Sequence, residues 1–119
     1  MKQSKNQFDI VVVGGGHAGI EAAHIAAFKG SHIALVTMDP GALGRMSCNP
    51  AIGGLAKGQM VREIDALGGL MGRFADSTGL QYKMLNRSKG RSVWSPRAQI
   101  DKRNYEALVR KTIISTENI

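Results

Sequence analysis

The chain has 119 residues, about one domain's worth, which excludes an enzyme with separate cofactor and substrate domains. Hydrophobic residues make up 43% and charged residues 21%, which excludes a disordered or fibrous protein. The single cysteine, Cys48, excludes an internal disulfide and a dithiol redox centre. His17, His24 and His32 have no carboxylate or cysteine at ligand spacing, so no metal site is expected. No apolar run reaches the roughly 18 residues of a membrane span, and residues 1–7 do not resemble a signal peptide, so we expect a cytoplasmic protein without membrane contact.

The net charge of +7 is concentrated in one segment. Residues 1–82 carry 7 basic and 6 acidic side chains, and residues 104–119 carry two of each. Residues 83–103 carry seven basic side chains against Asp101, a net charge of +6. The basic residues of this segment are Lys83, Arg87, Lys89, Arg91, Arg97, Lys102 and Arg103. Such a local excess predicts an anionic partner, either a phosphate or a nucleic acid.

The first forty residues predict a strand, a helix and a second strand. Phe8–Val13 is short, β-branched and followed by glycine, which is typical of a buried parallel strand. A helix is predicted over His17–Lys29, with Gly30 as its C-terminal stop. His32–Thr37 is the second predicted strand, and a turn follows at residues 39–41. These elements form one right-handed βαβ unit.

The remaining sequence predicts further α/β structure. Residues 41–58 are glycine-rich and read mostly as loop, a helix is predicted over Lys57–Leu67, and Leu80–Leu85 suits a strand. Ser95-Pro96 predicts the start of a last helix, with serine as N-cap and proline at the first helical position. The expected buried faces are Met60, Val61, Ile64 and Leu67 in the first of these helices, and Tyr105, Leu108, Val109, Thr112 and Ile113 in the last. No repeat or linker interrupts the chain, so residues 1–119 read as one part of a dinucleotide-binding α/β domain.

The strongest motif is the glycine turn between the first strand and the first helix. Its sequence, Gly14-Gly15-Gly16-His17-Ala18-Gly19, satisfies G-x-G-x-x-G in the context that dinucleotide-binding proteins require. The first glycine permits a sharp turn, the second lets a pyrophosphate approach the backbone, and the third lets the helix pack on the sheet. The amides at the start of the helix would bind the phosphates. The alternative is a turn that only packs a helix on a strand.

The ribose contact of such a site departs from the usual pattern. Dinucleotide-binding units commonly place an acidic residue at the end of the second strand, and here that position is Thr37. The hydroxyl of Thr37 holds the ribose, or Asp39 reaches back to it, or other groups do so.

Cys48 lies in the segment Met46-Ser47-Cys48-Asn49-Pro50, after the second predicted strand. Loops in that position line the ligand crevice of an open parallel sheet, so Cys48 is placed to face a cofactor or substrate. Two interpretations remain open: a reactive thiolate near a helix start, or a small buried apolar side chain.

The segment Arg87-Ser88-Lys89-Gly90-Arg91, with Trp94 and Arg97, combines cations with an aromatic ring. This combination is typical of nucleic-acid surfaces, so Arg87, Lys89, Arg91 and Arg97 are candidate RNA-binding residues. The alternative is a solvated, charged loop and helix face.

Four stretches together resemble the tRNA uridine 5-carboxymethylaminomethyl modification enzyme family (MnmG/GidA). They are residues 9–23, residues 46–54 (Met-Ser-Cys-Asn-Pro-Ala-Ile-Gly-Gly), residues 63–69 (Glu-Ile-Asp-Ala-Leu-Gly-Gly), and residues 85–90 together with 97–99. The last three are far more specific than the glycine turn, and the resemblance extends from Phe8 to about Arg110. Family members are several times longer, so the chain looks like an N-terminal piece.

The resemblance implies a flavoprotein that uses FAD, with NADH as reductant and methylene-tetrahydrofolate as carbon donor. It implies modification of C5 of the wobble uridine in tRNA, together with a partner GTPase of the MnmE type, and a homodimer at full length. Residues 14–19 would hold the FAD pyrophosphate, and Cys48 would be the motif cysteine that adds to the uracil ring or transfers a proton near the flavin.

Three positions depart from the family pattern: Arg45 in place of glutamine, Gln59 in place of histidine, and Arg91-Ser92 in place of proline-alanine.

Two other functions remain possible on the sequence. One is a general flavin oxidoreductase with a small substrate, and the other is an isolated nucleotide-binding fragment without activity.

Overall fold

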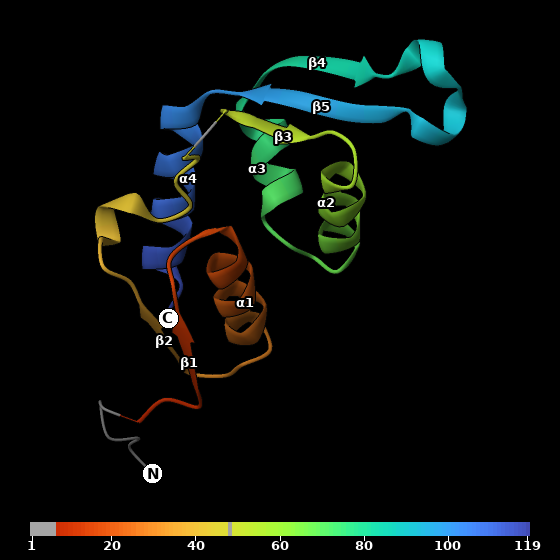
Figure 1. The fold of residues 1–119 in the computed structure, drawn as a ribbon. Helices are drawn as coiled ribbons and strands as arrows, with labels where there is room; N and C mark the ends of the chain where they lie inside the picture. The colour runs from red at the N-terminus through yellow and green to blue at the C-terminus, as the bar shows by residue number, and fades with distance from the viewer. Residues whose placement is uncertain (1–6, 48) are drawn as a thin grey trace. The chain divides into compact units, whose positions relative to one another are not determined.

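The computed structural model describes residues 7–47 and 49–119. Two compact units make up the chain (Figure 1). The first unit contains Met1–Arg45 and Val109–Ile119, and the second contains Met46–Leu108. No helix in the described part of the chain has the length and apolar character needed to cross a membrane.

The first unit is built on the predicted strand–helix–strand motif. Strand β1 (Ile10–Val13) and strand β2 (Ile33–Val36) pair in parallel, and helix α1 (His17–Phe28) connects them (Figure 1). Ile10 lies opposite Ile33, and the register continues without a shift to the ends of both strands. The predicted βαβ unit is therefore confirmed, and with it the α/β, Rossmann-like fold class.

Small side chains bring helix α1 close to the strands. Ala23, Ala27 and Ile33 form a buried cluster, and Val12 packs against it. The expected burial of the first strand is wrong, however, because Val11 is 60% exposed and Val13 is 81% exposed. Within the described residues, β1 pairs only with β2 and carries a helix on one face, so these two valines on its other face remain uncovered.

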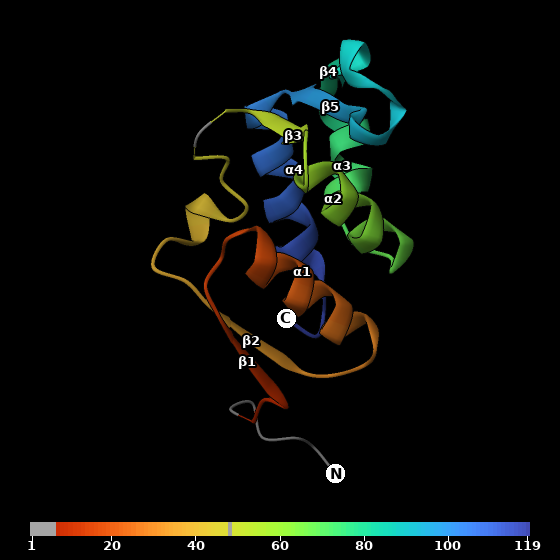
Figure 2. The ribbon, with the colours of Figure 1, turned by 45° about the vertical axis from the view of Figure 1, so that its right-hand side comes forward.

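The second unit is a three-stranded antiparallel sheet with helices on one face (Figure 2). Its strand order is β3-β5-β4, with β5 in the centre. Its elements are β3 (Ala51–Gly53), α2 (Lys57–Ala66), α3 (Met71–Thr78), β4 (Gly79–Leu85), β5 (Ser95–Ile100) and the start of α4 (Lys102–Ser115). The predicted strand at 80–85 and the predicted helix at 57–67 are confirmed, whereas β3 and α3 were not predicted. Both are short; β3 lies in the glycine-rich segment 41–58 that the sequence patterns assign mostly to loop, and the sequence analysis assigned no element to the α3 segment.

The last helix does not start at Ser95-Pro96, which is a correction to the sequence-based prediction. Both residues lie in β5, and α4 begins at Lys102. Asp101 caps this helix, because its Oδ1 accepts a hydrogen bond from the Asn104 backbone N–H at 3.1 Å. The carbonyl of Pro96 accepts a hydrogen bond from Gly54 N–H, beyond the end of β3. Proline has no N–H to donate on this side, and the carbonyl of Gly54 instead accepts a hydrogen bond from Gly58 N–H at 2.8 Å.

The apolar faces of the helices agree only in part with expectation. In α4, Tyr105, Val109 and Ile113 are buried, as predicted. In α2, Met60 is 59% exposed and Leu67 is 77% exposed, so the predicted buried face of this helix is wrong at two positions. The sheet and α3 cover only one side of α2, and these two side chains lie outside the covered area.

Candidate functional site

The glycine turn leaves strand β1 through a backbone conformation that favours glycine. Gly14 has φ +116°, outside the region that side-chain-bearing residues adopt. Its N–H donates to the carbonyl of Val36 at 2.8 Å, which ties the turn to the end of β2. The turn therefore lies at the carboxyl ends of both parallel strands, where α/β sheets bind ligands.

Gly16 leaves the start of helix α1 accessible. No atom outside its immediate neighbours lies within 4 Å of the position a Cβ would take. Gly16 is also the N-cap of α1, and no side chain caps the helix. The first intrahelical bond joins Ile20 N–H to the carbonyl of Gly16. Open space beside the N-terminus of a helix suits an anionic group such as a pyrophosphate.

Gly19 is required by the packing of α1 on β1. A Cβ at this position would overlap the carbonyl oxygen of Gly14 and come within 3.5 Å of Val12. The three glycines of the motif thus have three different local environments: a left-handed turn, an open approach and a close contact. These are the environments that the sequence motif predicts.

Thr37 lies against the glycine turn, whereas Asp39 is engaged elsewhere. A Cβ on Gly15 would come within 2.8 Å of Thr37 Oγ1, so that hydroxyl directly neighbours the turn. Asp39 Oδ1 accepts a hydrogen bond from Gly41 N–H at 2.8 Å, and Asp39 Oδ2 lies 3.9 Å from the Arg45 guanidinium. Of the two ribose-binding residues considered from the sequence, Thr37 is the one whose side chain faces the turn. Arg45, one of the departures from the family pattern, therefore has the Asp39 carboxylate as its neighbour.

His17 and Ala18 occupy the first two positions of α1. Partial burial lowers the pKa of His17 below its usual value of 6.5, and the neighbouring Glu21 carboxylate opposes this shift more weakly. The imidazole is therefore neutral at pH 7. A neutral side chain at this end of the helix adds no positive charge to that of the helix dipole.

Cys48, the predicted catalytic residue, lies outside the described residues. Of the residues described on either side of it, Met46 is buried, and the carbonyl of Asn49 accepts a hydrogen bond from Ala51 N–H at 2.8 Å. Within residues 7–47 and 49–119, no three His, Cys, Asp or Glu side chains cluster closely enough to hold a metal ion.

The predicted RNA-binding residues gather on the β4–β5 hairpin. Arg87 and Lys89 lie in one 3-10 turn and Arg91 in the next, and all three are exposed. Trp94 Nε1–H donates to the Arg87 carbonyl at 3.3 Å, and the Arg91 guanidinium lies 5.8 Å from the centre of the Trp94 ring. The tip of the hairpin is thus a folded turn that presents three cations.

Arg97 lies on β5, directly opposite Lys83 of β4. The sequence analysis counted Lys83 in the basic segment but did not select it as a binding residue. Only the pairing of the two strands reveals that it neighbours Arg97. The one sequence signal was that Lys83 lies in a predicted strand.

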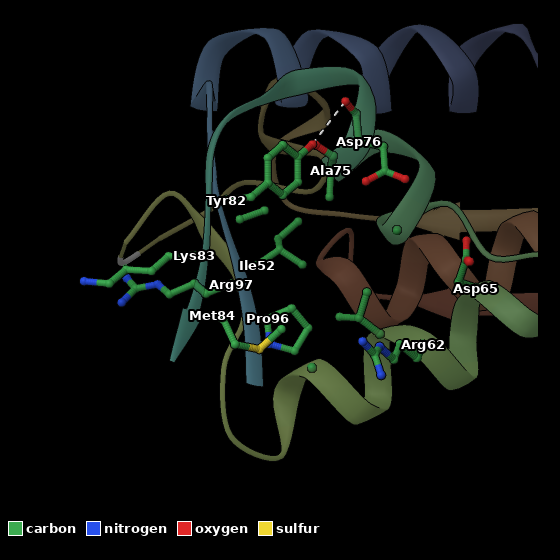
Figure 3. Close-up of a pocket in the computed structure, with 15 residues that line it drawn as sticks. Ile52, Arg62, Asp65, Ala75, Asp76, Tyr82, Lys83, Met84, Pro96 and Arg97 are labelled. Carbon is green, nitrogen blue, oxygen red and sulfur yellow. Dashed lines mark hydrogen bonds between the residues drawn. The ribbon is translucent and has the colours of Figure 1, made fainter. Parts of the chain in front are cut away.

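A cavity of about 430 Å³ lies within the second unit, between the sheet and helices α2 and α3 (Figure 3). Arg62, Asp65 and Asp76 bring charged groups to its lining. Tyr82 Oη donates to the carbonyls of Ala75 and Asp76 at 3.4 Å each. The apolar lining includes Ile52, Val61, Ala75, Met84 and Pro96. The sequence did not predict this cavity, because its walls come from five elements whose packing no local pattern specifies.

Comparison with known proteins gives consistent results. The profile of the family described as "Glucose inhibited division protein A" matches residues 9–119. The chain is 56% identical over 114 residues to the tRNA uridine 5-carboxymethylaminomethyl modification enzyme MnmG of Aquifex aeolicus, covering 96% of this chain and 18% of that protein. It is 55% identical over 113 residues to the enzyme of the same name from Phocaeicola vulgatus, covering 95% of this chain and 18% of that protein.

A solved structure of Aquifex aeolicus GidA matches with a TM-score of 0.89 at 57% identity, covering 95% of this chain and 19% of that chain. The chain therefore spans less than a fifth of the length of these relatives.

The first prediction separates packing from ligand access within the glycine turn. Gly19→Ala would force a methyl group against the Gly14 carbonyl, so we expect the free energy of unfolding to fall by about 3 kcal/mol. Gly16→Ala meets no neighbour, so its cost should stay below about 1 kcal/mol. Urea denaturation of both variants measures the difference, and equal stabilities would contradict this account of Gly19.

The second prediction concerns His17. Because its pKa is lower in the folded state, the unfolded state binds more protons at pH values below 6.5. The free energy of unfolding should therefore fall as the pH decreases through this range and be fully retained above it. Thermal denaturation at several pH values checks this, and His17→Gln should reduce the dependence. An equally steep pH dependence in His17→Gln would assign the effect to other groups.

Proposed function

The chain belongs to the glucose inhibited division protein A family, and we propose that it supplies the FAD-binding turn of an enzyme that modifies C5 of the wobble uridine in tRNA. The observation that carries this proposal is the open position at Gly16 beside the uncapped start of helix α1. Family membership and the name of the Aquifex aeolicus relative support the choice of tRNA as substrate.

The turn suits the diphosphate of FAD in both shape and charge. A diphosphate seated beside Gly16 would accept hydrogen bonds from the amides of His17 and Ala18, at the positive end of the helix dipole. The hydroxyl of Thr37 would face the adenosine ribose. Gly14, Gly15 and Gly19 would act through the backbone, by shaping the turn rather than by contributing side chains.

Bound FAD would supply the redox chemistry, with NADH as the electron source and methylene-tetrahydrofolate as the source of the one-carbon unit. We assign to Cys48 the activation of the uracil ring. Addition of its thiolate at C6 would raise the electron density at C5, which would bond to the one-carbon unit as that carbon's bond to the folate nitrogen breaks. Loss of the C5 proton would then expel the thiolate and restore the ring.

The remaining interactions of the enzyme involve macromolecules. The exposed cations Arg87, Lys89 and Arg91 would bind tRNA phosphates at the tip of the hairpin, together with Arg97 on β5. The full-length enzyme would form a homodimer, work with a GTPase of the MnmE type, and act in the cytoplasm.

The third prediction tests the role of Cys48 in the full-length protein. Cys48→Ser should retain FAD, measured by its absorption spectrum, because the glycine turn is unchanged. Modification of tRNA, measured by mass spectrometry of the wobble nucleoside, should fall by a factor of about 1,000 or more. The neighbouring variant Ser47→Ala serves as the control and should remain active. Normal modification by Cys48→Ser with bound FAD would contradict the assignment.

The fourth prediction tests the hairpin tip. Replacing Arg87, Lys89 and Arg91 with glutamine should weaken tRNA binding. The logarithmic salt dependence of the binding constant should become shallower by about 2 to 3, because fewer counterions are released. The matched control replaces the exposed cations Arg73, Arg110 and Lys111, which lie outside the basic segment. An unchanged salt dependence in the tip variant would exclude the tip from the RNA interface.

A further inference from the structure

Two cations lie side by side on the β4–β5 hairpin. The antiparallel register places Lys83 directly opposite Arg97, and residues paired in this way project from the same face of a sheet. Figure 3 shows their charged ends next to each other at the edge of the cavity, which both residues help to line. The two side chains belong to different strands, so the backbone ladder fixes their spacing.

This arrangement has no compensating acid within the described residues. Neither side chain has a hydrogen bond or ion pair with any residue in 7–47 or 49–119. Like charges directly opposite each other on neighbouring strands destabilise a sheet. An anion bound between them would remove that repulsion, and a phosphate group has enough oxygens to accept hydrogen bonds from both side chains at once.

The two faces of the sheet differ in a way that agrees with ligand binding on one of them. Tyr82, Met84 and Pro96 point toward the cavity beneath the sheet (Figure 3). On the row that contains Lys83 and Arg97, the partner from β3 is Gly53. This residue has φ +104°, and a Cβ on it would overlap the Pro96 carbonyl. No third side chain therefore extends this row over β3.

The pair continues toward the cations at the tip of the same hairpin. Lys83 lies two residues before the end of β4, and Arg87 begins the 3-10 turn that follows. The cations of the pair and of the tip form one row along the hairpin, here called the track. A single phosphate could bind at only one end of this track, whereas the backbone of a nucleic acid presents phosphates along its length. The extent of the track therefore favours a polyanion.

We propose that Lys83 and Arg97 form a phosphate clamp that holds the RNA backbone behind the hairpin tip. This inference rests on the proposed function, because tRNA is the polyanion that the enzyme would bind. The sequence predicted Arg97, but not Lys83, as an RNA-binding residue. The strand pairing places Lys83 opposite Arg97, so both side chains would bind the same phosphate. The clamp contacts no base, so it binds without regard to sequence.

The test measures binding of unmodified tRNA by the full-length protein at several salt concentrations. Lys83→Gln combined with Arg97→Gln should weaken binding by about tenfold and make the logarithmic salt slope shallower by about 1. The double variant Lys83→Arg with Arg97→Lys keeps both positive charges, so it should bind within about twofold of the wild type and keep the salt slope. Arg110→Gln with Lys111→Gln removes the same charge from exposed positions of α4 and is the matched control.

The possible outcomes are distinguishable. Equal loss in the clamp variant and in the α4 control would show only an effect of net charge and would overturn the clamp. Loss of NADH binding with unchanged tRNA binding would assign the phosphate to a dinucleotide and would also overturn it. Unchanged tRNA binding with a lower melting temperature would show a structural role alone. If the clamp variant loses tRNA affinity as expected but the wild-type protein holds no FAD, the clamp stands and the proposed function fails.

Discussion

The close contact between helix α1 and strand β1 is the constraint on which the candidate cofactor site depends. At Gly19 the helix approaches so closely that any side chain would overlap the Gly14 carbonyl. This contact brings the start of the helix to the carboxyl end of the strand, and the absence of a side chain on Gly16 leaves open space beside it. The burial of Ala23 and Ala27 against Ile33 extends the same close packing along the helix. A phosphate site built mainly from backbone depends on this packing more than on any single polar side chain.

The sequence predicted most reliably where local pattern and tertiary contact agree. The βαβ unit has a short apolar strand, a glycine turn and a helix with small apolar residues, and all of these reflect one packing arrangement. Ser95-Pro96 shows the opposite case. The two residues match a helix start, but both pair with β4, with Ser95 opposite Leu85 and Pro96 opposite Met84. Asp101, six residues after Ser95, caps the helix that follows. The pairing between strands, which no local pattern reveals, therefore outweighed the local preference of these residues for a helix start.

The candidate sites show the same limit. The environments of Gly14, Gly16 and Gly19 follow from the motif, because each role depends on backbone geometry within six residues. The neighbour relation of Lys83 and Arg97 does not, because it depends on the register between two strands joined by a nine-residue connection. The exposure of Val11 and Val13 has another origin. The apolar run predicts a strand covered on both faces, whereas within residues 7–47 and 49–119 a helix packs on only one face of β1.

The most direct test of the central claim is a structure of the full-length protein with bound FAD. The account predicts that the diphosphate lies beside Gly16, within hydrogen-bonding distance of the backbone amides at the start of helix α1. It also predicts that the ribose hydroxyls face Thr37. A diphosphate bound elsewhere, or protein atoms covering those amides, would contradict the assignment of this turn as the flavin site.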